Sequence, residues 1–552
     1  MDKKKSETQV SREDMAHDED NKIVLEISTD LDVNIKHINY LFQDCMDVVK
    51  REVNICKDAT FRIYGVYVDG LINRDILENY LLSKVFEYKN LNGEVFDANT
   101  TPAKLIMQHF SATFDVKEVQ GMDAMASAIL SGDSAIFIEG SSTGLVIATR
   151  GWPGRSIGEP ATESVVRGPR DGFTETIRFN TVLVRRRIRD TKLKVKMMSV
   201  GTRSRTDVAI MYMEDIARPE LVEAVQQRID KYVIDAIFDS GYIEQLIEDS
   251  WKSPFPQTQA TERPDKFASS LLEGKVGILV DTSPFGIIVP TTLNAYYQAS
   301  EDYYQRWQIM TFTRLLRYIV SFLSFTLPGL YIATLNFQPQ MLPTSFAISI
   351  AASREGITFS TVMEIIVMEL IFELFREAGI RAPGAIGHVI GLVGGIVIGQ
   401  AAVDANIISP MIIIIIALTA ICTFAIPDYS LTSSFRLIRY FVIAFSAIFG
   451  LYGFLIAMLI ILTHLSSLES FGIPYLAPYN ISDQNESKDV KDTVLRFPTF
   501  MQTTRPIFAR KSQRIKLRVR NGINAQDVAP GNNSGKTNGQ VPDKGNNNDG
   551  GE

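Results

Sequence analysis

The sequence predicts a chain of two halves. The first is an α+β or α/β cytoplasmic N-terminal region of two similar subdomains, and the second is a polytopic α-helical membrane domain. The 552 residues are too many for a single hydrophobic core. Near residue 315 the composition changes from a mixed soluble pattern to long apolar runs with Gly and Pro, and the soluble half contains an internal repeat.

These changes in composition divide the chain into six segments. We predict a disordered charged head (1–21), soluble subdomains (22–160 and 161–305), a transmembrane helical domain (306–466), a basic C-terminal segment (467–520) and a disordered Asn/Gly-rich tail (521–552). The membrane domain has room for about four to six spans. The head lacks the apolar stretch of a signal peptide, so we expect the N-terminal region to be cytoplasmic.

The repeat consists of ASAILSGDSAIFIEGSSTGLVIA (126–148), which aligns without gaps on ASSLLEGKVGILVDTSPFGIIVP (268–290). Each copy is typical of a helix end, a Gly stop and two short apolar strands joined by a turn. We expect two helices before each copy, KHINYLFQDCMDVVKREV and RDILENYLLSKVFEY before the first, PELVEAVQQRIDKYV and GYIEQLIED before the second. The alternative is two hairpins that merely look alike.

Four stretches of the second half approach the roughly 20 apolar residues that cross a bilayer. They are 318–337, 385–402, 407–426 and 440–463. The glycines of GHVIGLVGGIVIG recur every four residues and predict close helix packing, within the chain or between subunits. They are Gly387, Gly391, Gly395 and Gly399.

The stretch 357–377 is apolar but carries Glu364, Glu369 and Glu373. Each apolar residue favours insertion by about 0.3–0.6 kcal/mol, whereas a central acidic residue costs about 2.5–3.5 kcal/mol. Two glutamates therefore roughly cancel the gain. We expect this helix to line a water-filled cavity, to pack inside a bundle, or to lie at the membrane interface.

The arginines near the apolar stretches give conflicting indications of topology. Pairs at 314/317, 376/381 and 436/439 place three loops on the cytoplasmic side, so that the last span exits to the outside. The basic run after residue 495 indicates the inside instead. Either FGIPYLAPY (471–479) re-enters the membrane, or one of the candidate stretches does not cross it.

Several classes of function find no support in the sequence. The three cysteines form no disulfide framework, the five histidines show no metal-ligand spacing, and no catalytic or dinucleotide motif is present. We therefore predict no enzyme, no catalytic residue, no metal and no cofactor. The net charge of −7 argues against a nucleic-acid partner.

Long blocks of the sequence resemble the A subunits of spore germination receptors, the GerA family, from about residue 30 to 510. The blocks include GWPGRSIGEPATESVVRGPRDGFTETIRFNTVLVRRRIRD (151–190), SGYIEQLIEDSWKSPFPQTQATERPD (240–265), LLEGKVGILVDTSPFGIIVPTTLNAYYQASEDYYQRW (271–307) and IPDYSLTSSFRLIRY (426–440). The resemblance implies a nutrient receptor in the spore inner membrane with a cytoplasmic soluble domain. It also implies a transporter-like B subunit, a lipoprotein C subunit and self-association.

Two hypotheses about residues follow from this resemblance. We expect the helix with Glu364, Glu369 and Glu373 to form the wall of a cation pore, because acidic rings suit cation passage. We expect the arginine-rich stretch 165–190 to form a junction between subdomains or between subunits, in pairs with Asp171, Glu175 and Asp190. Its members include Arg167, Arg170, Glu175, Arg178 and Arg185. The alternative for this stretch is a solvated strand face.

Overall fold

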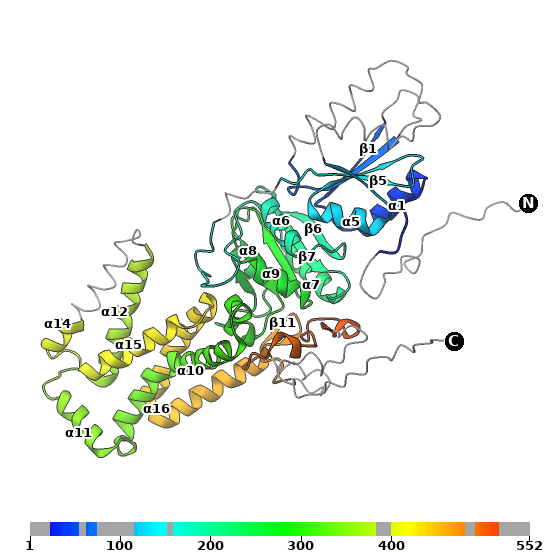
Figure 1. The fold of residues 1–552 in the computed structure, drawn as a ribbon. Helices are drawn as coiled ribbons and strands as arrows, with labels where there is room; N and C mark the ends of the chain where they lie inside the picture. Colours follow the sequence, from blue (N-terminus) through cyan, green and yellow to red (C-terminus); the bar gives the residue numbers. More distant parts are fainter. Residues whose placement is uncertain are drawn as a thin grey trace, which may run out of the picture.

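The computed structural model describes residues 23–54, 62–73, 115–151, 158–381, 399–480 and 492–517. Within these ranges the chain forms two five-stranded sheets with their helices, followed by a helical region that extends away from them (Figure 1). The expected disordered head and tail, the expected helix RDILENYLLSKVFEY and most of the stretch 385–402 lie outside the described residues.

The two sheets share one strand order, although they come from different parts of the chain. The first sheet runs β1-β2-β4-β5-β3 and the second β6-β7-β9-β10-β8, and every neighbouring pair is antiparallel. The strands of the first sheet are β1 (Val48–Asn54), β2 (Arg62–Val68), β3 (Val116–Val119), β4 (Ser134–Ile138) and β5 (Gly144–Ile147). Those of the second are β6 (Leu193–Val200), β7 (Thr206–Met213), β8 (Gln259–Thr261), β9 (Val276–Val280) and β10 (Gly286–Val289).

Helices cover the sheets and complete what we call the first and second sheet units. In the first unit, α1 (Leu31–Leu41) and α5 (Met122–Ser131) bury their apolar side chains against β2 and β4. In the second unit, α6 (Ile177–Arg187) and α9 (Pro264–Leu272) cover one face, and α7 (Pro219–Asp230) and α8 (Ser240–Ile247) cover the other. Alternate residues along the strands of the second unit therefore belong to two separate hydrophobic cores, one on each face of the sheet.

The repeat has the local structure that the sequence predicts. In both copies a helix, α5 or α9, is followed by a strand hairpin, β4–β5 or β9–β10. Gly132 and Gly274 stand between helix and hairpin with φ of 95° and 94°. Glycine adopts this left-handed conformation at little energetic cost, which is why the sequence stops each helix there.

Two expectations for local structure are wrong. The helix expected over 36–53 ends at Leu41, and β1 follows it, because the valines of β1 pair with β2 in an antiparallel ladder. The segment 177–187, for which a solvated strand face was the alternative, is helix α6, and its residues 180–185 are all buried. Tertiary packing has overridden local propensity at both places.

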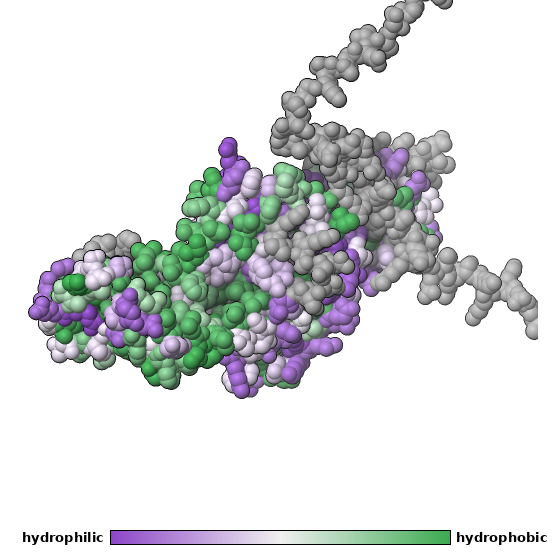
Figure 2. Space-filling model, turned by 90° about the horizontal axis from the view of Figure 1, so that it is seen from below, coloured by the Kyte–Doolittle hydropathy of each residue, from purple (hydrophilic) through white to green (hydrophobic). Residues whose placement is uncertain are grey.

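The helical region begins where the second unit ends. The connector contains η2 (Leu293–Tyr297) and η3 (Ser300–Tyr303), and short turns η4 (Ala333–Phe337) and η5 (Pro339–Met341) follow the first long helix. The helices are α10 (Trp307–Ile332), α11 (Thr344–Ser353), α12 (Thr361–Arg381), α14 (Gly399–Asp404), α15 (Pro410–Phe424) and α16 (Tyr429–Ser467). Figure 2 shows hydrophobic side chains gathered over this region.

Two described elements are long and apolar enough to cross a membrane by length and composition, Trp307–Phe337 and Tyr429–Ser467. Helix α15 is shorter than a usual span. The second long element is not straight, because Gly450 has non-helical angles (φ 62°, ψ −136°). The rings of Phe435 and His464 lie 6.3 and 5.9 Å from the ring of Phe255, whereas a straight helix would separate these two residues by about 43 Å.

Helix α16 is therefore a hairpin of two arms, 429–449 and 451–467, and Gly450 divides the apolar stretch expected to span over 440–463 between them. The second arm leads back to the second sheet unit, where Tyr475 is fully buried and its carbonyl accepts the Leu293 N–H (2.9 Å). The segment FGIPYLAPY, with β11 (Glu469–Ser470) and β12 (Ile473–Pro474), thus packs on protein.

The segment 492–517, with turns η8 (Thr499–Met501) and η9 (Lys511–Gln513), also returns to the second unit. Ala509 forms an isolated antiparallel β-bridge with Ala217, and the Arg510 N–H donates to the Ile216 carbonyl (2.9 Å). A Cβ on Gly274 would lie 2.7 Å from the Ala509 Cα, so a glycine is needed for this close approach. The basic C-terminal segment therefore lies beside the sheet units.

Candidate functional site

The three glutamates of α12 point into the helical region, and each one meets an arginine from another element. The pairs are Glu364–Arg354, Glu369–Arg439 and Glu373–Arg436, and Arg376 also contacts Glu373. We call these groups the polar seam. The sequence placed Arg376, Arg436 and Arg439 in loops as markers of topology, whereas the structure places all three within helices.

The Glu364 carboxylate lies at the start of α15. It is fully buried and accepts hydrogen bonds from Arg354 Nη2 (2.9 Å) and from the Ser409 N–H (2.8 Å). Arg354 also donates to Thr361, at the first turn of α12. Because Ser409 directly precedes α15, its N–H has no carbonyl group of that helix to donate to. Glu364 therefore ties the ends of α11, α12 and α15 together.

Arg439 joins four helices. Its Nη1 donates to Glu369 Oε2 (2.7 Å), its Nε to the Ser324 carbonyl of α10 (2.8 Å) and its Nη2 to Thr423 of α15 (2.9 Å). The side chains of Arg439 and Glu369 are each only 3% exposed. The other oxygen, Glu369 Oε1, is buried and has no hydrogen bond among the described residues. The seam therefore keeps an unused acceptor at its centre.

Glu373 lies at the more open end of the seam. Arg436 Nη1 donates to its Oε1 (2.7 Å), and Arg376 Nη1 is 3.3 Å from its Oε2. The Glu373 side chain is 41% exposed. Next to Glu373 around the helix, α12 exposes an apolar stripe that includes Met363, Ile366, Leu370 and Leu374. The helix therefore turns its carboxylates toward protein and its apolar side outward.

These contacts show how an acidic helix persists in apolar surroundings. An isolated buried carboxylate would be strongly disfavoured, but a guanidinium partner with further hydrogen bonds offsets much of the desolvation. Removing one partner leaves an uncompensated buried charge. Pairs of this kind can fix the relative positions of helices, and a change of partner would move the helices with them.

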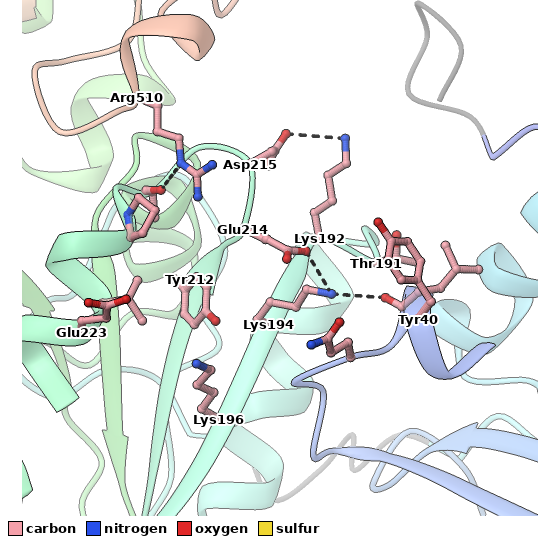
Figure 3. Close-up of a pocket in the computed structure, with 15 residues that line it drawn as sticks. Tyr40, Thr191, Lys192, Lys194, Lys196, Tyr212, Glu214, Asp215, Glu223 and Arg510 are labelled. Atoms are coloured by element: carbon pink, nitrogen blue, oxygen red, sulfur yellow. Dashed lines mark hydrogen bonds and ion pairs between the residues drawn. The ribbon is translucent and has the colours of Figure 1, made fainter. Parts of the chain in front are cut away.

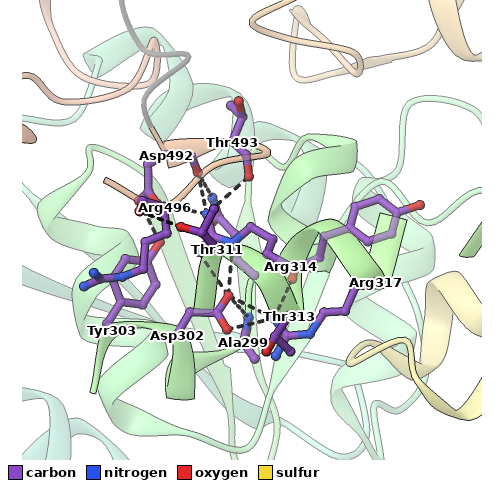
Figure 4. A network of polar contacts seen from close by, with 12 residues as sticks. Ala299, Asp302, Tyr303, Thr311, Thr313, Arg314, Arg317, Asp492, Thr493 and Arg496 are labelled. Atoms are coloured by element: carbon purple, nitrogen blue, oxygen red, sulfur yellow. Dashed lines mark hydrogen bonds and ion pairs between the residues drawn. The ribbon is translucent and has the colours of Figure 1, made fainter. Parts of the chain in front are cut away.

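A second buried network fixes the base of α10 (Figure 4). Arg314 donates to Asp302 (3.0 and 3.1 Å) and to Asp492 (3.0 Å), and Arg317 donates to Asp302 (2.8 Å). The Arg314 and Asp302 side chains are fully buried. Asp302 belongs to η3, and Asp492 to the C-terminal segment. The network therefore joins the connector, the first long helix and the C-terminal segment.

Two arginines of the arginine-rich stretch, Arg185 and Arg178, pair with carboxylates of the first sheet unit. Arg185, fully buried on α6, makes a bidentate pair with Asp47 (2.6 and 2.8 Å), and Arg178 lies 3.5 Å from Asp69. Arg187 binds Asp171 at 2.6 and 2.7 Å within the second unit. The expected partners did not include Asp47 or Asp69. Both follow from strand pairing, since Asp47 directly precedes β1 and Asp69 directly follows β2.

The remaining predicted junction residues lie at the surface. Arg167 and Glu175 are exposed, and Arg170 pairs with Glu159 (3.1 Å), both side chains being more than half exposed. In the glycine stretch, Gly387, Gly391 and Gly395 lie outside the described residues. A Cβ at Gly399 would meet no atom within 4 Å. The packing of these residues against other subunits stays a prediction.

Comparisons with known proteins agree with the resemblance. Residues 36–508 match the family model described as Bacillus/Clostridium GerA spore germination protein. The chain is 38% identical over 490 residues to spore germination protein KA of Bacillus subtilis (strain 168), covering 89% of this chain and 88% of that one. It is 38% identical to spore germination protein GerLA of Bacillus cereus (88% and 96%). Identity to stage V sporulation protein AF of Bacillus subtilis (strain 168) is 36% (78% and 85%).

One solved structure is also similar. It is the N-terminal domain of the A subunit of the Bacillus megaterium spore germinant receptor GerK3, at 30% identity and a TM-score of 0.38, covering 48% of this chain and 97% of that one. A family model that matches most of the chain, with relatives of this identity, defines the class of protein. The chain belongs to the GerA spore germination family.

Proposed function

We propose that the chain is the A subunit of a nutrient germinant receptor in the spore inner membrane. It converts nutrient binding into the release of ions from the spore, and so into germination. Family membership and the names of the germination relatives support this role. The two long apolar elements fit a membrane protein with its sheet units in the cytoplasm.

The polar seam is the observation that carries the proposal of a cation conduit. With the glutamates held by arginines, a passing cation finds no free carboxylate, which corresponds to a closed state. When the pairs open, Glu364, Glu369 and Glu373 face the ion path and stabilise cations. The Glu369 Oε1 atom, which accepts no hydrogen bond among the described residues, supports this switch, since a buried acceptor without a donor is costly and favours rearrangement to a new partner.

Partners supply the bias that opens the seam. A transporter-like B subunit binds the nutrient, a lipoprotein C subunit completes the receptor, and several A chains assemble in lipid around the conduit, with Gly387, Gly391, Gly395 and Gly399 as packing positions. The nutrient-bound partner must prefer the open arrangement, because a ligand shifts an equilibrium only by its difference in affinity between the two states.

Substitution of the glutamates tests the conduit. Glu364→Gln and Glu369→Gln keep the side-chain shape and remove the charge, so we expect altered rates of nutrient-triggered ion release from spores. Glu355→Gln is the matched control, because Glu355 is an exposed carboxylate just after α11. Release at the wild-type rate in both variants, at normal protein levels, would remove the glutamates from the ion path.

A second candidate is a sporulation-stage membrane protein that acts without its own nutrient specificity, or a scaffold without a pore. The 36% identity to stage V sporulation protein AF supports the first of these two possibilities. Deletion of the gene, followed by germination on a nutrient panel, separates the first possibility from a receptor. Purified protein in liposomes separates the second, since a conduit passes cations and a scaffold does not.

A further inference from the structure

A cleft of about 570 Å³ lies where three parts of the chain meet, and neither the seam nor the α10 network uses it. Tyr40, Leu41 and Gln43 contribute from the first sheet unit, at the end of α1. Strands β6 and β7 with helix α7 contribute from the second unit, and Arg510 contributes from the C-terminal segment (Figure 3). The cleft exists only while all three parts are docked.

Basic side chains gather on one wall of this cleft. Lys192 directly precedes β6, and Lys194 and Lys196 alternate along it, so the period of two puts all three on the same face. Arg510 adds a fourth cation.

Each of the three lysines lies near a carboxylate, but the pair of Lys196 is the longest and its lysine the most exposed of the three, and Arg510 makes no ion pair among the described residues. Lys194 Nζ lies 3.2 Å from Glu214 Oε2 and donates to the Leu41 carbonyl (3.2 Å), and Lys192 Nζ lies 3.7 Å from Asp215. Lys196 Nζ is 3.8 Å from Asp44, a carboxylate that is 45% exposed. Arg510 donates through Nε to the Ala217 carbonyl (2.6 Å), which orients its planar guanidinium.

The positions of these two cations define the chemistry of a ligand. Figure 3 shows the Arg510 guanidinium and the Lys196 ammonium on either side of Tyr212. Glu223 lines the α7 wall and disfavours an anionic group there. Arginine and lysine at two separate places suit a molecule with two or more carboxylate or phosphate groups, since charge-assisted hydrogen bonds are the strong ones.

We propose that this cleft binds a small polyanion carrying carboxylate or phosphate groups, held by Lys196 and Arg510. Binding fixes the first sheet unit, the second sheet unit and the C-terminal segment relative to one another. A ligand of the docked arrangement alone stabilises that arrangement by mass action. A ligand in this cleft therefore acts on the two sheet units directly, without involving the polar seam.

The test is a titration of the purified full-length protein in detergent with pyrophosphate, and separately with citrate, at constant ionic strength. We expect saturable binding by calorimetry, a raised unfolding temperature and weaker binding as NaCl increases. Pyrophosphate and citrate distinguish a phosphate ligand from a carboxylate ligand. The proposal is overturned if neither anion saturates the protein up to about 10 mM, which corresponds to a binding free energy weaker than roughly 3 kcal/mol.

Variants locate the site. Lys196→Gln and Arg510→Ala should each weaken binding by about tenfold or more. Lys117→Ala, on an exposed lysine of the first unit, should leave it unchanged. Arg510→Ala could weaken binding simply by loosening the C-terminal segment. Lys196→Gln then gives the decisive comparison, because Lys196 is partly exposed and its ion pair is with Asp44, outside that segment. Unchanged affinity in Lys196→Gln would place the binding elsewhere and contradict the proposal.

Discussion

The chain uses buried arginine–carboxylate pairs in two unlike surroundings. Arg185–Asp47 lies between two sheet units that each have their own hydrophobic core, whereas Arg439–Glu369 lies among apolar helices. In the sheet units the hydrophobic cores supply most of the stability, and the pair joins the two units. In the membrane domain that we propose, the hydrophobic effect would not select one helix packing over another, so polar contacts would carry more of the specificity.

The largest predicted effect of a single change is in the helical region. Arg439→Ala leaves the buried Glu369 carboxylate without its partner and removes the contacts to α10 and α15, so we expect a loss of about 3–5 kcal/mol in the free energy of unfolding. Thermal unfolding in detergent measures it. Arg381→Ala is the control, because the Arg381 side chain is 79% exposed. Equal unfolding temperatures for both variants would show that the seam does not organise the helices.

The next effect is at the contact between the sheet units. Arg185→Lys keeps the charge but cannot reproduce the bidentate pair with Asp47, so we expect a loss of about 1–3 kcal/mol. Denaturant unfolding of the full chain, followed by the signal of the sheets, measures it. A loss below the error of the measurement would mean that the charge alone, and not the planar guanidinium, holds the units.

A smaller effect depends on pH and involves Glu248, which directly follows α8. Burial, with help from the Glu244 carboxylate, raises the pKa of Glu248 from its usual value near 4.5 to about 7. A raised pKa means that the folded state favours the protonated form, so the cost of ionisation appears as the pH rises from about 4.5 through 7. Glu248→Gln should therefore stabilise the chain at pH 8, by about 1 kcal/mol after solvent screening, and give no gain at pH 5. A gain of the same size at both pH values would contradict the assignment.

The smallest effect concerns the exposed contact between the sheet units. Arg178 lies 3.5 Å from Asp69, and its side chain is 64% exposed. Exposed ion pairs contribute about 0–1 kcal/mol, so Arg178→Ala should change stability far less than Arg185→Lys. The same unfolding experiment compares the two variants directly. A larger loss for Arg178→Ala would reverse the ranking of buried over exposed pairs.

The sequence predicted the repeat well, because its signals are local. A Gly stop after a helix and two short apolar runs are enough to indicate the hairpins β4–β5 and β9–β10. The repeat in fact extends further: Asn34 and Asn180, both fully buried, make the same paired hydrogen bonds to residues 28 and 174. In each copy the same hydrogen bonds come from one buried asparagine side chain, although the other residues of 28–34 and 174–180 differ between the copies.

The sequence also predicted that the glutamates of α12 must face water or protein, since hydrocarbon excludes them. It could not name their partners. Arg439 lies 70 residues from Glu369 along the chain, and such a pairing depends on how the helices pack. The hairpin in α16 was missed for a related reason. Gly450 stands in a continuous apolar run, and composition alone does not separate one long span from two arms that fold against each other.

The most direct test of the account is a charge exchange at the centre of the seam. Glu369→Arg and Arg439→Glu should each abolish nutrient-triggered ion release, because like charges then meet in a buried position. The double variant restores an opposite pair, so we expect it to recover most of the unfolding temperature that each single variant loses, while ion release stays impaired because residue 369 then carries a positive charge. A double variant that unfolds at as low a temperature as either single one, with all three proteins purified in the same detergent, would contradict the role of the Glu369–Arg439 pair.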